Sequence, residues 1–331
     1  MNIFPFSHLP RTLLTHLPTP IEPLSGLSKH MGGPSILVKR DDLTSLAMGG
    51  NKTRKLEFLL ADAVEQGADT VITSGGSQSN HCRLTAAAAT RLGLKCELVF
   101  GGEQRVDMPN GNLFLDQLFG ATVHWSEPEL RNETVKKVAI SLRTKGRTPY
   151  VIPIGGSNGI GAVGYVAAMY EFQEQLASTG QEVDHIIFAT SSGGTHVGLQ
   201  LGARLTGFQG QILGLSIDQT KTGEFPPKLA DVANETAERL QVNEQFEPDD
   251  FTMNTDYLGS GYGVVGDLER ETITLAARCD GLLVGPVYTG RALGGLIDLI
   301  RRGTFHQDET VLFWHTGGVP ALFAYVNEVS V

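Results

Sequence analysis

A lysine that follows two glycines is the first residue of this sequence whose surroundings point to chemistry. Lys52 lies in the run GGNKTRK, which begins at Gly49. The glycines allow a tight turn and a close approach of the backbone to a ligand. Burial, the start of a helix and the neighbouring Lys55 would each lower the pKa of the Lys52 amine, as a nucleophilic lysine requires. The alternative is a solvated lysine at a helix N-terminus.

A loop of small residues far downstream has the composition of a phosphate-binding site. The loop TSSGGTH begins at Thr190, after an apolar strand and before a helix through residues 199–201. Its backbone N–H groups would point outward at the helix N-terminus, where a phosphate dianion is favoured. The expected donors are Ser192, Gly193, Gly194 and Thr195. The alternative is an ordinary glycine-rich turn.

A reactive lysine combined with a phosphate-binding loop is what pyridoxal 5'-phosphate (PLP) requires. The lysine forms a Schiff base with the aldehyde of the cofactor, and the N–H groups hold its phosphate. Lys55 lies one helical turn after Lys52, which suits a contact to that phosphate.

Three further motifs contain side chains suited to catalysis. One motif is a turn after another strand, formed by Gln78, Ser79 and Asn80. Its polar groups can bind a substrate carboxylate or the ring oxygen of the cofactor. The alternative, which is compatible with this role, is that Ser79 or Asn80 caps a helix. Tyr262 and Tyr288 each lie in a glycine-rich loop, which makes them candidates for proton transfer or ring stacking.

A nucleotide-binding interpretation has one motif in its favour. The run GIGAVG from Gly159 matches the dinucleotide pattern, but an extra loop separates it from the preceding strand, and the next strand ends without an acidic residue. We expect these glycines to permit a close loop.

Composition excludes several classes of protein. The chain has 331 residues, 41% of them hydrophobic and 19% charged, which predicts a substantial core in one large or two ordinary domains. A net charge of −10 argues against a nucleic-acid partner. Three cysteines without C-x-x-C spacing argue against disulfides or a metal site and fit the cytoplasm. We expect neither a signal peptide nor a membrane span.

Short apolar runs alternate with helical patterns, which predicts βαβ units and two parallel sheets. We expect strands over residues 69–73, 95–100, 121–125, 149–154, 185–189, 212–217, 281–284 and 311–314, and helices around residues 86–89, 112–119, 129–145 and 162–176.

The motifs together resemble those of the fold-type II PLP enzymes, the tryptophan synthase β-like group. The similarity is to the branch that contains 1-aminocyclopropane-1-carboxylate (ACC) deaminase, D-cysteine desulfhydrase and L-cysteate sulfo-lyase. It covers nearly the whole chain and rests on GGNKTRKLEFL from Gly49, QSNH from Gln78, PVYTG from Pro286 and HTGG from His315.

This resemblance implies an α/β fold of two domains, each a mainly parallel twisted sheet flanked by helices. The small domain would cover residues 48–160, and the large PLP-binding domain residues 1–47 and 161–331, with the cofactor in the cleft between them. A homodimer acting on a small amino-acid substrate is implied as well.

The resemblance also implies a role for each site residue, with PLP as cofactor and no metal. Lys52 is the Schiff-base lysine, Asn80 faces the phenolic oxygen of the cofactor, and Thr316 faces its pyridine nitrogen. The implied catalytic residues are Lys52, Ser79, Tyr288 and Tyr262. The implied cofactor contacts are Lys52, Lys55, Asn80, Ser192, Gly193, Gly194, Thr195 and Thr316, and the implied substrate contacts are Ser79, Gln78, Asn80 and Tyr288.

The residue after Tyr288 decides between members of this branch. It is Thr289 here, where the resemblance places glutamate in the deaminases, which disfavours ring opening of the cyclopropane. We therefore predict a β-elimination that converts D-cysteine to pyruvate, hydrogen sulfide and ammonia. The alternatives are L-cysteate sulfo-lyase, ACC deaminase and, outside this class, an inactive PLP-binding or nucleotide-binding protein. The site motifs contain no additional arginine for a sulfonate, which counts against L-cysteate.

Overall fold

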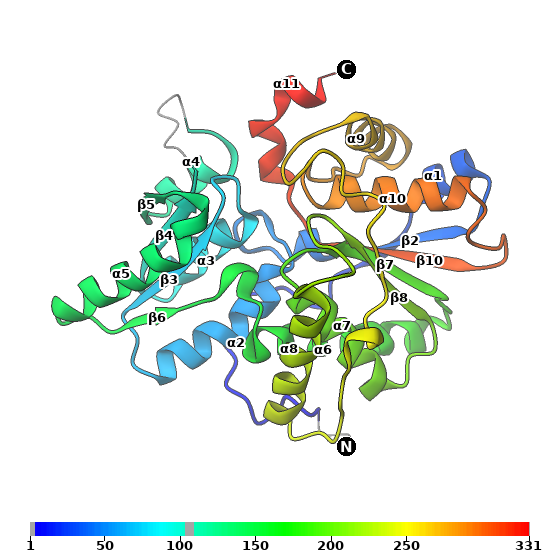
Figure 1. The fold of residues 1–331 in the computed structure, drawn as a ribbon. Coiled ribbons are helices and arrows are strands. Elements are labelled where there is room, and N and C mark those ends of the chain that lie inside the picture. Colours follow the sequence, from blue (N-terminus) through cyan, green and yellow to red (C-terminus); the bar gives the residue numbers. More distant parts are fainter. Residues whose placement is uncertain (1–3, 103–108, 331) are drawn as a thin grey trace.

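The computed structural model describes residues 4–102 and 109–330. Positions 1–3, 103–108 and 331 lie outside it, and with them the first residues of the N-terminal segment and part of the expected small domain. Within the described ranges the strands form two separate sheets, as expected (Figure 1). No helix in those ranges combines the length and the apolar character that crossing a bilayer requires.

The larger sheet has the strand order β1-β2-β10-β7-β8-β9. Only β1 runs antiparallel to its neighbour, and the remaining pairs are parallel. The strands are β1 (Ile21–Pro23), β2 (Ser35–Arg40), β7 (His185–Thr190), β8 (Gln211–Ser216), β9 (Met253–Asn254) and β10 (Thr310–His315).

Helices cover both faces of this sheet, which explains why its strands are continuous apolar runs. Val311 and Phe313 of β10 pack against one group of helices, and Leu312 and Trp314 pack against the other. The first group is α1 (Ser25–Met31), α9 (Asp267–Asp280) and α10 (Thr289–Arg301); the second is α6 (Gly159–Thr179) and α7 (Gly194–Thr206), with α8 (Phe225–Arg239) beside them (Figure 1).

The smaller sheet has the order β5-β4-β3-β6 and is parallel throughout. Its strands are β3 (Thr70–Gly75), β4 (Lys95–Gly101), β5 (Thr122–Ser126) and β6 (Pro149–Val151). The helices of this part are α2 (Lys52–Glu65), α3 (Asn80–Arg91), α4 (Gly111–Leu118) and α5 (Arg131–Thr144), and α11 (Val326–Val329) ends the described chain.

One expected strand is wrong, and three strands were not expected. Residues 281–284 form no strand, because β10 has β2 and β7 as its two neighbours and no edge beside it is open. The run starts at Gly281, which ends α9 with a φ of 63°, and it continues as irregular chain. The three strands that were not expected are β1, β2 and β9.

The glycines of GIGAVG lie in the first turns of α6 instead of in a loop. Their use is in helix packing, because a Cβ on Gly164 would lie 2.3 Å from the carbonyl oxygen of Arg54 in α2. Without a side chain at this position, α6 and α2 approach closely. The expectation of a close loop here is therefore wrong.

A buried carboxylate joins α2 to the larger sheet. Asp41, directly after β2, accepts hydrogen bonds from Arg54 Nε at 2.9 Å and Nη2 at 2.8 Å, from Tyr165 Oη at 2.6 Å and from Trp314 Nε1 at 2.8 Å. Arg54 also pairs with Glu171 of α6 at 2.9 Å. Burial alone would raise the pKa of Asp41, but the Arg54 charge outweighs it and brings that pKa to about 2.

We predict that Asp41→Asn lowers the free energy of unfolding by about 3 kcal/mol or more, because it leaves buried donors poorly matched. Since the pKa of Asp41 is depressed, its contribution is present above pH ~4, the value for an unfolded carboxyl, and is lost as the pH falls through about 2. Urea unfolding of the wild type and of Asp41→Asn at pH 7 measures the loss of stability. The same comparison at pH 3 should give a smaller difference.

Asp42→Asn is the matched control, because Asp42 is less buried than Asp41 and pairs with Arg40, whose side chain is partly exposed, so its loss should cost less. Equal urea midpoints for the wild type and Asp41→Asn at pH 7 would contradict the prediction.

Candidate active site

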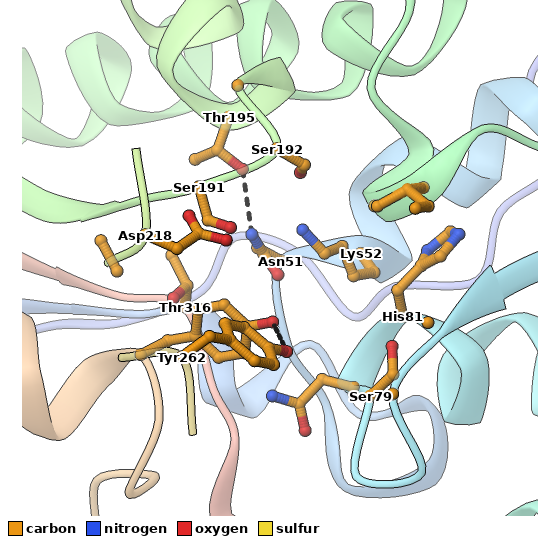
Figure 2. A pocket seen from close by; sticks show the side chains of 18 of the residues that line it. Asn51, Lys52, Ser79, His81, Ser191, Ser192, Thr195, Asp218, Tyr262 and Thr316 are labelled. Atoms are coloured by element: carbon orange, nitrogen blue, oxygen red, sulfur yellow. Dashed lines mark hydrogen bonds between the residues drawn. The ribbon is translucent and has the colours of Figure 1, made fainter. Parts of the chain in front are cut away.

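A cavity of about 440 Å³ is lined by residues of both sheets. Its lining includes the residues that directly follow the carboxyl ends of β3, β7 and β10 and those near the end of β8. Parallel sheets place ligand sites at this edge. Figure 2 shows Lys52, Thr195, Tyr262 and Thr316 facing one another around the cavity.

Most of the predicted site residues meet in this cavity. Those that line it are Lys52, Ser79, Asn80, Ser192, Gly193, Thr195, Tyr262, Tyr288 and Thr316. Lys55, Gly194 and Gln78 are not part of the lining, although each lies against a residue or loop that is.

Lys52 begins α2 and is half-buried in the cavity. Burial lowers the pKa of its amine to about 8, and a hydrogen bond with Lys55 opposes part of that shift. Lys55 lies deeper, where burial and then the charge of Lys52 lower its pKa well below the usual value. Its Nζ donates to the carbonyl oxygen of Gly155 at 3.2 Å and to Ser157 Oγ at 3.3 Å. Two lysines so close together favour an anion beside them.

The loop before α7 has the geometry of an anion cradle. Gly193 has a φ of 97°, which suits only glycine well, and a Cβ on Gly194 would lie 2.9 Å from Lys55 Nζ. Ser157 supports the loop, because its Oγ accepts from Gly194 N at 3.0 Å and donates to Ser192 Oγ at 2.8 Å. The backbone therefore passes directly above the buried lysine.

Thr195 is held by the residue that precedes Lys52. Its Oγ1 accepts a hydrogen bond from Asn51 Nδ2 at 2.9 Å (Figure 2). Since Asn51 directly precedes Lys52, this bond ties the loop to the start of α2.

Hydrogen bonds to α3 and to the start of α4 hold the turn before α3 in place. Ser79 caps α3, because its Oγ accepts from Cys82 N at 3.2 Å. The Gln78 amide is used away from the cavity: Oε1 accepts from Asn112 N at 2.9 Å, and Nε2 donates to the Asn110 carbonyl oxygen at 3.1 Å. The structure therefore brings Ser79 and Asn80 to the cavity but not the Gln78 side chain.

The two tyrosines form a pair. Their hydroxyl groups are hydrogen-bonded to each other, and their ring centroids are 5.8 Å apart with the ring planes at 70°. Loss of water around the Tyr262 hydroxyl raises its pKa to about 12, although 47% of the residue is exposed. Burial also raises the pKa of Tyr288 well above its usual value. Both hydroxyls are therefore protonated at neutral pH and can donate.

Arg291 fixes the loop that carries Tyr262. It is buried in α10, pairs with Glu269 at 2.6 Å, and donates to the carbonyl oxygens of Leu258 at 2.7 Å and Val264 at 2.8 Å. Sequence motifs gave no sign of this role, because the bonded residues are far apart in the chain.

Thr289 acts through the backbone rather than in the cavity. It is fully buried, and its Oγ1 accepts from Gly285 N at 2.7 Å and donates to the Gly317 carbonyl oxygen at 3.0 Å. It thereby joins the segment before Tyr288 to the segment after Thr316. A glutamate could not occupy this space without moving both segments.

Several lining residues lie outside the site motifs of the sequence. Asp218 follows β8, and its place at the carboxyl end of a parallel strand was the one available signal. Arg131 at the start of α5 also lines the cavity, although it belongs to none of the site motifs. Its buried Nε has no hydrogen-bond partner among the described residues. His196, in contrast, belongs to the TSSGGTH motif; its buried ring lines the cavity, and burial lowers its pKa to about 3, so it is neutral.

We predict that the Lys52 amine reacts with trinitrobenzenesulfonate in cofactor-free protein with a midpoint near pH 8, because only the neutral amine is nucleophilic. Nα-acetyl-lysine mixed with the protein serves as the control, with a midpoint at the usual lysine value of about 10.4. Mass spectrometry of the modified Lys52 peptide and of the modified amino acid measures both rates. A Lys52 midpoint equal to that of the free amino acid would contradict the lowered pKa.

Comparisons with known proteins agree with this geometry. A family model described as "Pyridoxal-phosphate dependent enzyme" matches residues 12–317. A "D-cysteine desulfhydrase" of Klebsiella pneumoniae (strain 342) is 41% identical over 331 residues, covering 98% of this chain and 99% of the relative. A protein of the same name from Yersinia enterocolitica serotype O:8 / biotype 1B is 42% identical over 328 residues, covering 98% of each.

A solved structure has the same fold along its whole length. "Crystal Structure Analysis of the ACC deaminase homologue" superposes with a TM-score of 0.90 at 37% identity, covering 99% of both chains. These matches confirm the two-domain α/β fold and the cofactor expected from the sequence. The chain belongs to the family of pyridoxal-phosphate dependent enzymes.

Proposed function

We propose that this enzyme cleaves the carbon–sulfur bond of D-cysteine, consuming one water and releasing pyruvate, hydrogen sulfide and ammonia. The observation that carries the proposal is a lysine with a pKa near 8 in the same cavity as an anion-binding loop and a protonated tyrosine pair. The names of the relatives from Klebsiella and Yersinia support D-cysteine as the substrate. Thr289 supports it too, because it is not the glutamate that the resemblance assigns to the deaminases.

The residues present fit PLP. Thr190 Oγ1, at the cavity, is buried without a hydrogen-bond partner among the described residues, as expected where a polar ligand supplies one. Ser192, Gly193 and Thr195 would hold the phosphate, with Gly194 bonded to Ser157 in the same loop and the Lys55 amine beneath them as a further donor. When bound, the cofactor supplies an electron sink for negative charge at the α-carbon.

Thr316 would face the pyridine nitrogen of the cofactor. Its hydroxyl cannot keep a proton on that nitrogen as a carboxylate would, which weakens the electron sink and favours elimination over transamination.

In the proposed reaction Lys52 carries the cofactor and moves the proton at the α-carbon, which its pKa near 8 allows at neutral pH. The N-terminus of α3 at Ser79 and Asn80 would bind the substrate carboxylate. The tyrosine pair would donate a proton to the departing sulfur. Gln78 contributes through the turn that its amide stabilises, since the side chain is already bonded to Asn110 and Asn112.

The proposal includes the arrangement of the chain. We place the small domain at residues 48–160 and the large domain at 1–47 and 161–331, which agrees with the span of the smaller sheet from Thr70 to Val151. Cys82, Cys96 and Cys279 are all free, which supports a reducing cytoplasm. A homodimer is proposed from the resemblance, and sedimentation equilibrium would test it.

We predict that the cofactor-loaded protein forms pyruvate and sulfide from D-cysteine faster than from L-cysteine, D-serine or ACC. Lys52→Ala should reduce the rate at least about a hundredfold, because it removes the proton carrier. Lys95→Ala, at an exposed site, should not change it. Coupled lactate dehydrogenase and methylene blue assays measure the two products. Unchanged turnover in Lys52→Ala would contradict the role of the lysine.

Arg131 supports L-cysteate as a second candidate substrate. Among the described residues the Arg131 guanidinium makes no hydrogen bond or ion pair, and it lines the cavity. An unpaired guanidinium is suited to the sulfonate that L-cysteate carries in place of a thiol. The products would be pyruvate, sulfite and ammonia.

If Arg131 binds a sulfonate, Arg131→Gln should lower kcat/KM for L-cysteate about tenfold or more and leave D-cysteine within about threefold, because only the former loses a charge-assisted contact. Arg143→Gln, on the exposed side of the same helix, is the control. Sulfite release measured with Ellman's reagent provides the readout. An equal loss for both substrates would refute a sulfonate-specific contact.

A further inference from the structure

We infer that Asn112 is a positioning residue that fixes the orientation of the Asn80 amide, so that Asn80 presents its Nδ2 donor to the phenolic oxygen of the cofactor. The inference rests on the proposed role of Asn80 and adds a residue to which neither the motifs nor the comparisons give a role. The orientation is determined by which amide atoms of Asn112 and Asn80 can donate a hydrogen bond and which can only accept one.

Asn112 is placed rigidly beside the turn that carries Asn80. It is the second residue of α4 and is fully buried. Gly111 before it has a φ of 54°, and a Cβ there would lie 2.4 Å from Gln78 Oε1 and 2.9 Å from the Pro320 carbonyl oxygen. The start of α4 therefore packs closely against the turn and cannot move toward it without a steric clash.

A backbone carbonyl fixes the Asn112 side chain. The atom of Asn112 nearest the Gln78 carbonyl oxygen lies 2.8 Å from it. A carbonyl oxygen can only accept, so this atom must be Nδ2, because the reversed amide would bring two oxygens together. The backbone bond from Asn112 N to Gln78 Oε1 keeps the same turn in register.

The fixed Asn112 amide in turn fixes Asn80. The second N–H of Asn112 Nδ2 points to the Asn80 side chain at 2.9 Å. The facing atom must be Oδ1, because an amide nitrogen there would put two donors together. Asn80 Nδ2 therefore points away from α4, and Asn80 itself lines the cavity. Among the described residues this nitrogen has no hydrogen-bond partner.

A donor at this position affects the chemistry of the cofactor directly. A hydrogen bond to an ionised phenolic oxygen favours its charged form and so lowers the pKa of the bound cofactor. If the Asn80 amide turned over, its oxygen would face the phenolic oxygen and have the opposite effect. The residue that prevents this is Asn112, which touches neither cofactor nor substrate.

Asn112→Asp tests this inference, since the new carboxylate is nearly the same size as the amide but can only accept. Asn80 would then turn its Nδ2 toward α4 and its oxygen toward the cofactor. We expect the pH at which the visible colour of the bound cofactor titrates to rise by about one unit or more, because a hydrogen bond to a charged group is lost. The dissociation constant of the cofactor should rise about tenfold or more.

Asn110→Asp is the matched control, because it adds the same charge at an exposed position two residues away. Its titration midpoint should stay within about 0.3 pH unit of the wild-type value, as expected when a charge and the titrating group are ~10 Å apart with water between them. Asn112→Ser removes the amide donors without adding charge and should give a smaller rise. It serves in place of Asn112→Asp if that variant is unfolded by circular dichroism.

A double-mutant cycle separates positioning from a general structural effect. If Asn112 acts through Asn80, Asn112→Asp should shift the midpoint in the wild type but not in an Asn80→Ala background. A midpoint unchanged by Asn112→Asp, or a shift that persists in Asn80→Ala, would overturn the inference while the colour of the wild type still supports the proposed function. A wild type that stays colourless with PLP would overturn both.

Discussion

The site depends on one desolvated carboxylate. Asp41 is fully buried, and its two oxygens accept from side chains in four segments that are far apart in the sequence. A buried charge is tolerated only when its partners surround it closely, so these segments have a single workable arrangement. One partner, Arg54, lies two residues after Lys52 on α2. The requirement to neutralise Asp41 therefore sets where the reactive lysine lies.

The close contact at Gly164 enforces the same arrangement by shape rather than charge. It lets α6 meet the backbone of α2 at the residue that bonds Asp41. As a result α2 is attached to the larger sheet, although it also covers the smaller one. Lys52 thus shares a frame with the loop before α7, while α3 and α5 bring Ser79, Asn80 and Arg131 from the other sheet. The cavity is therefore divided between residues attached to the larger sheet and residues attached to the smaller one.

Local turn chemistry explains why much of the site was predictable. Lys52, the loop from Ser192 to Thr195 and the turn at Ser79 are each specified by a few adjacent residues, and the structure brings them to one cavity. Strands were harder to predict, because a short apolar run such as 281–284 fits a strand or irregular core equally well. Whether it pairs depends on which edges other strands have left open.

The residues that escaped prediction act across the fold. Arg131, Asp218 and Ser157 lie in unremarkable local sequence, and only the complete fold places the first two at the cavity and Ser157 against the loop before α7. Thr289 was noticed for its identity, but its role in joining two backbone segments is visible only when both are in place. Sequence motifs thus identify the groups that line the cavity better than those that hold such groups in position.

The order of strands has a consequence for synthesis of the protein. β10, one of the last elements of the chain, lies between β2 and β7 in the interior of the larger sheet. Until residues 310–316 have left the ribosome, β2 and β7 have no strand between them. Asp41 then lacks its hydrogen bond from Trp314, and the cavity lacks Thr316. A nascent chain therefore has the loop before α7 and Lys52 without the frame that joins them. The enzyme can bind its cofactor productively only after synthesis is nearly finished.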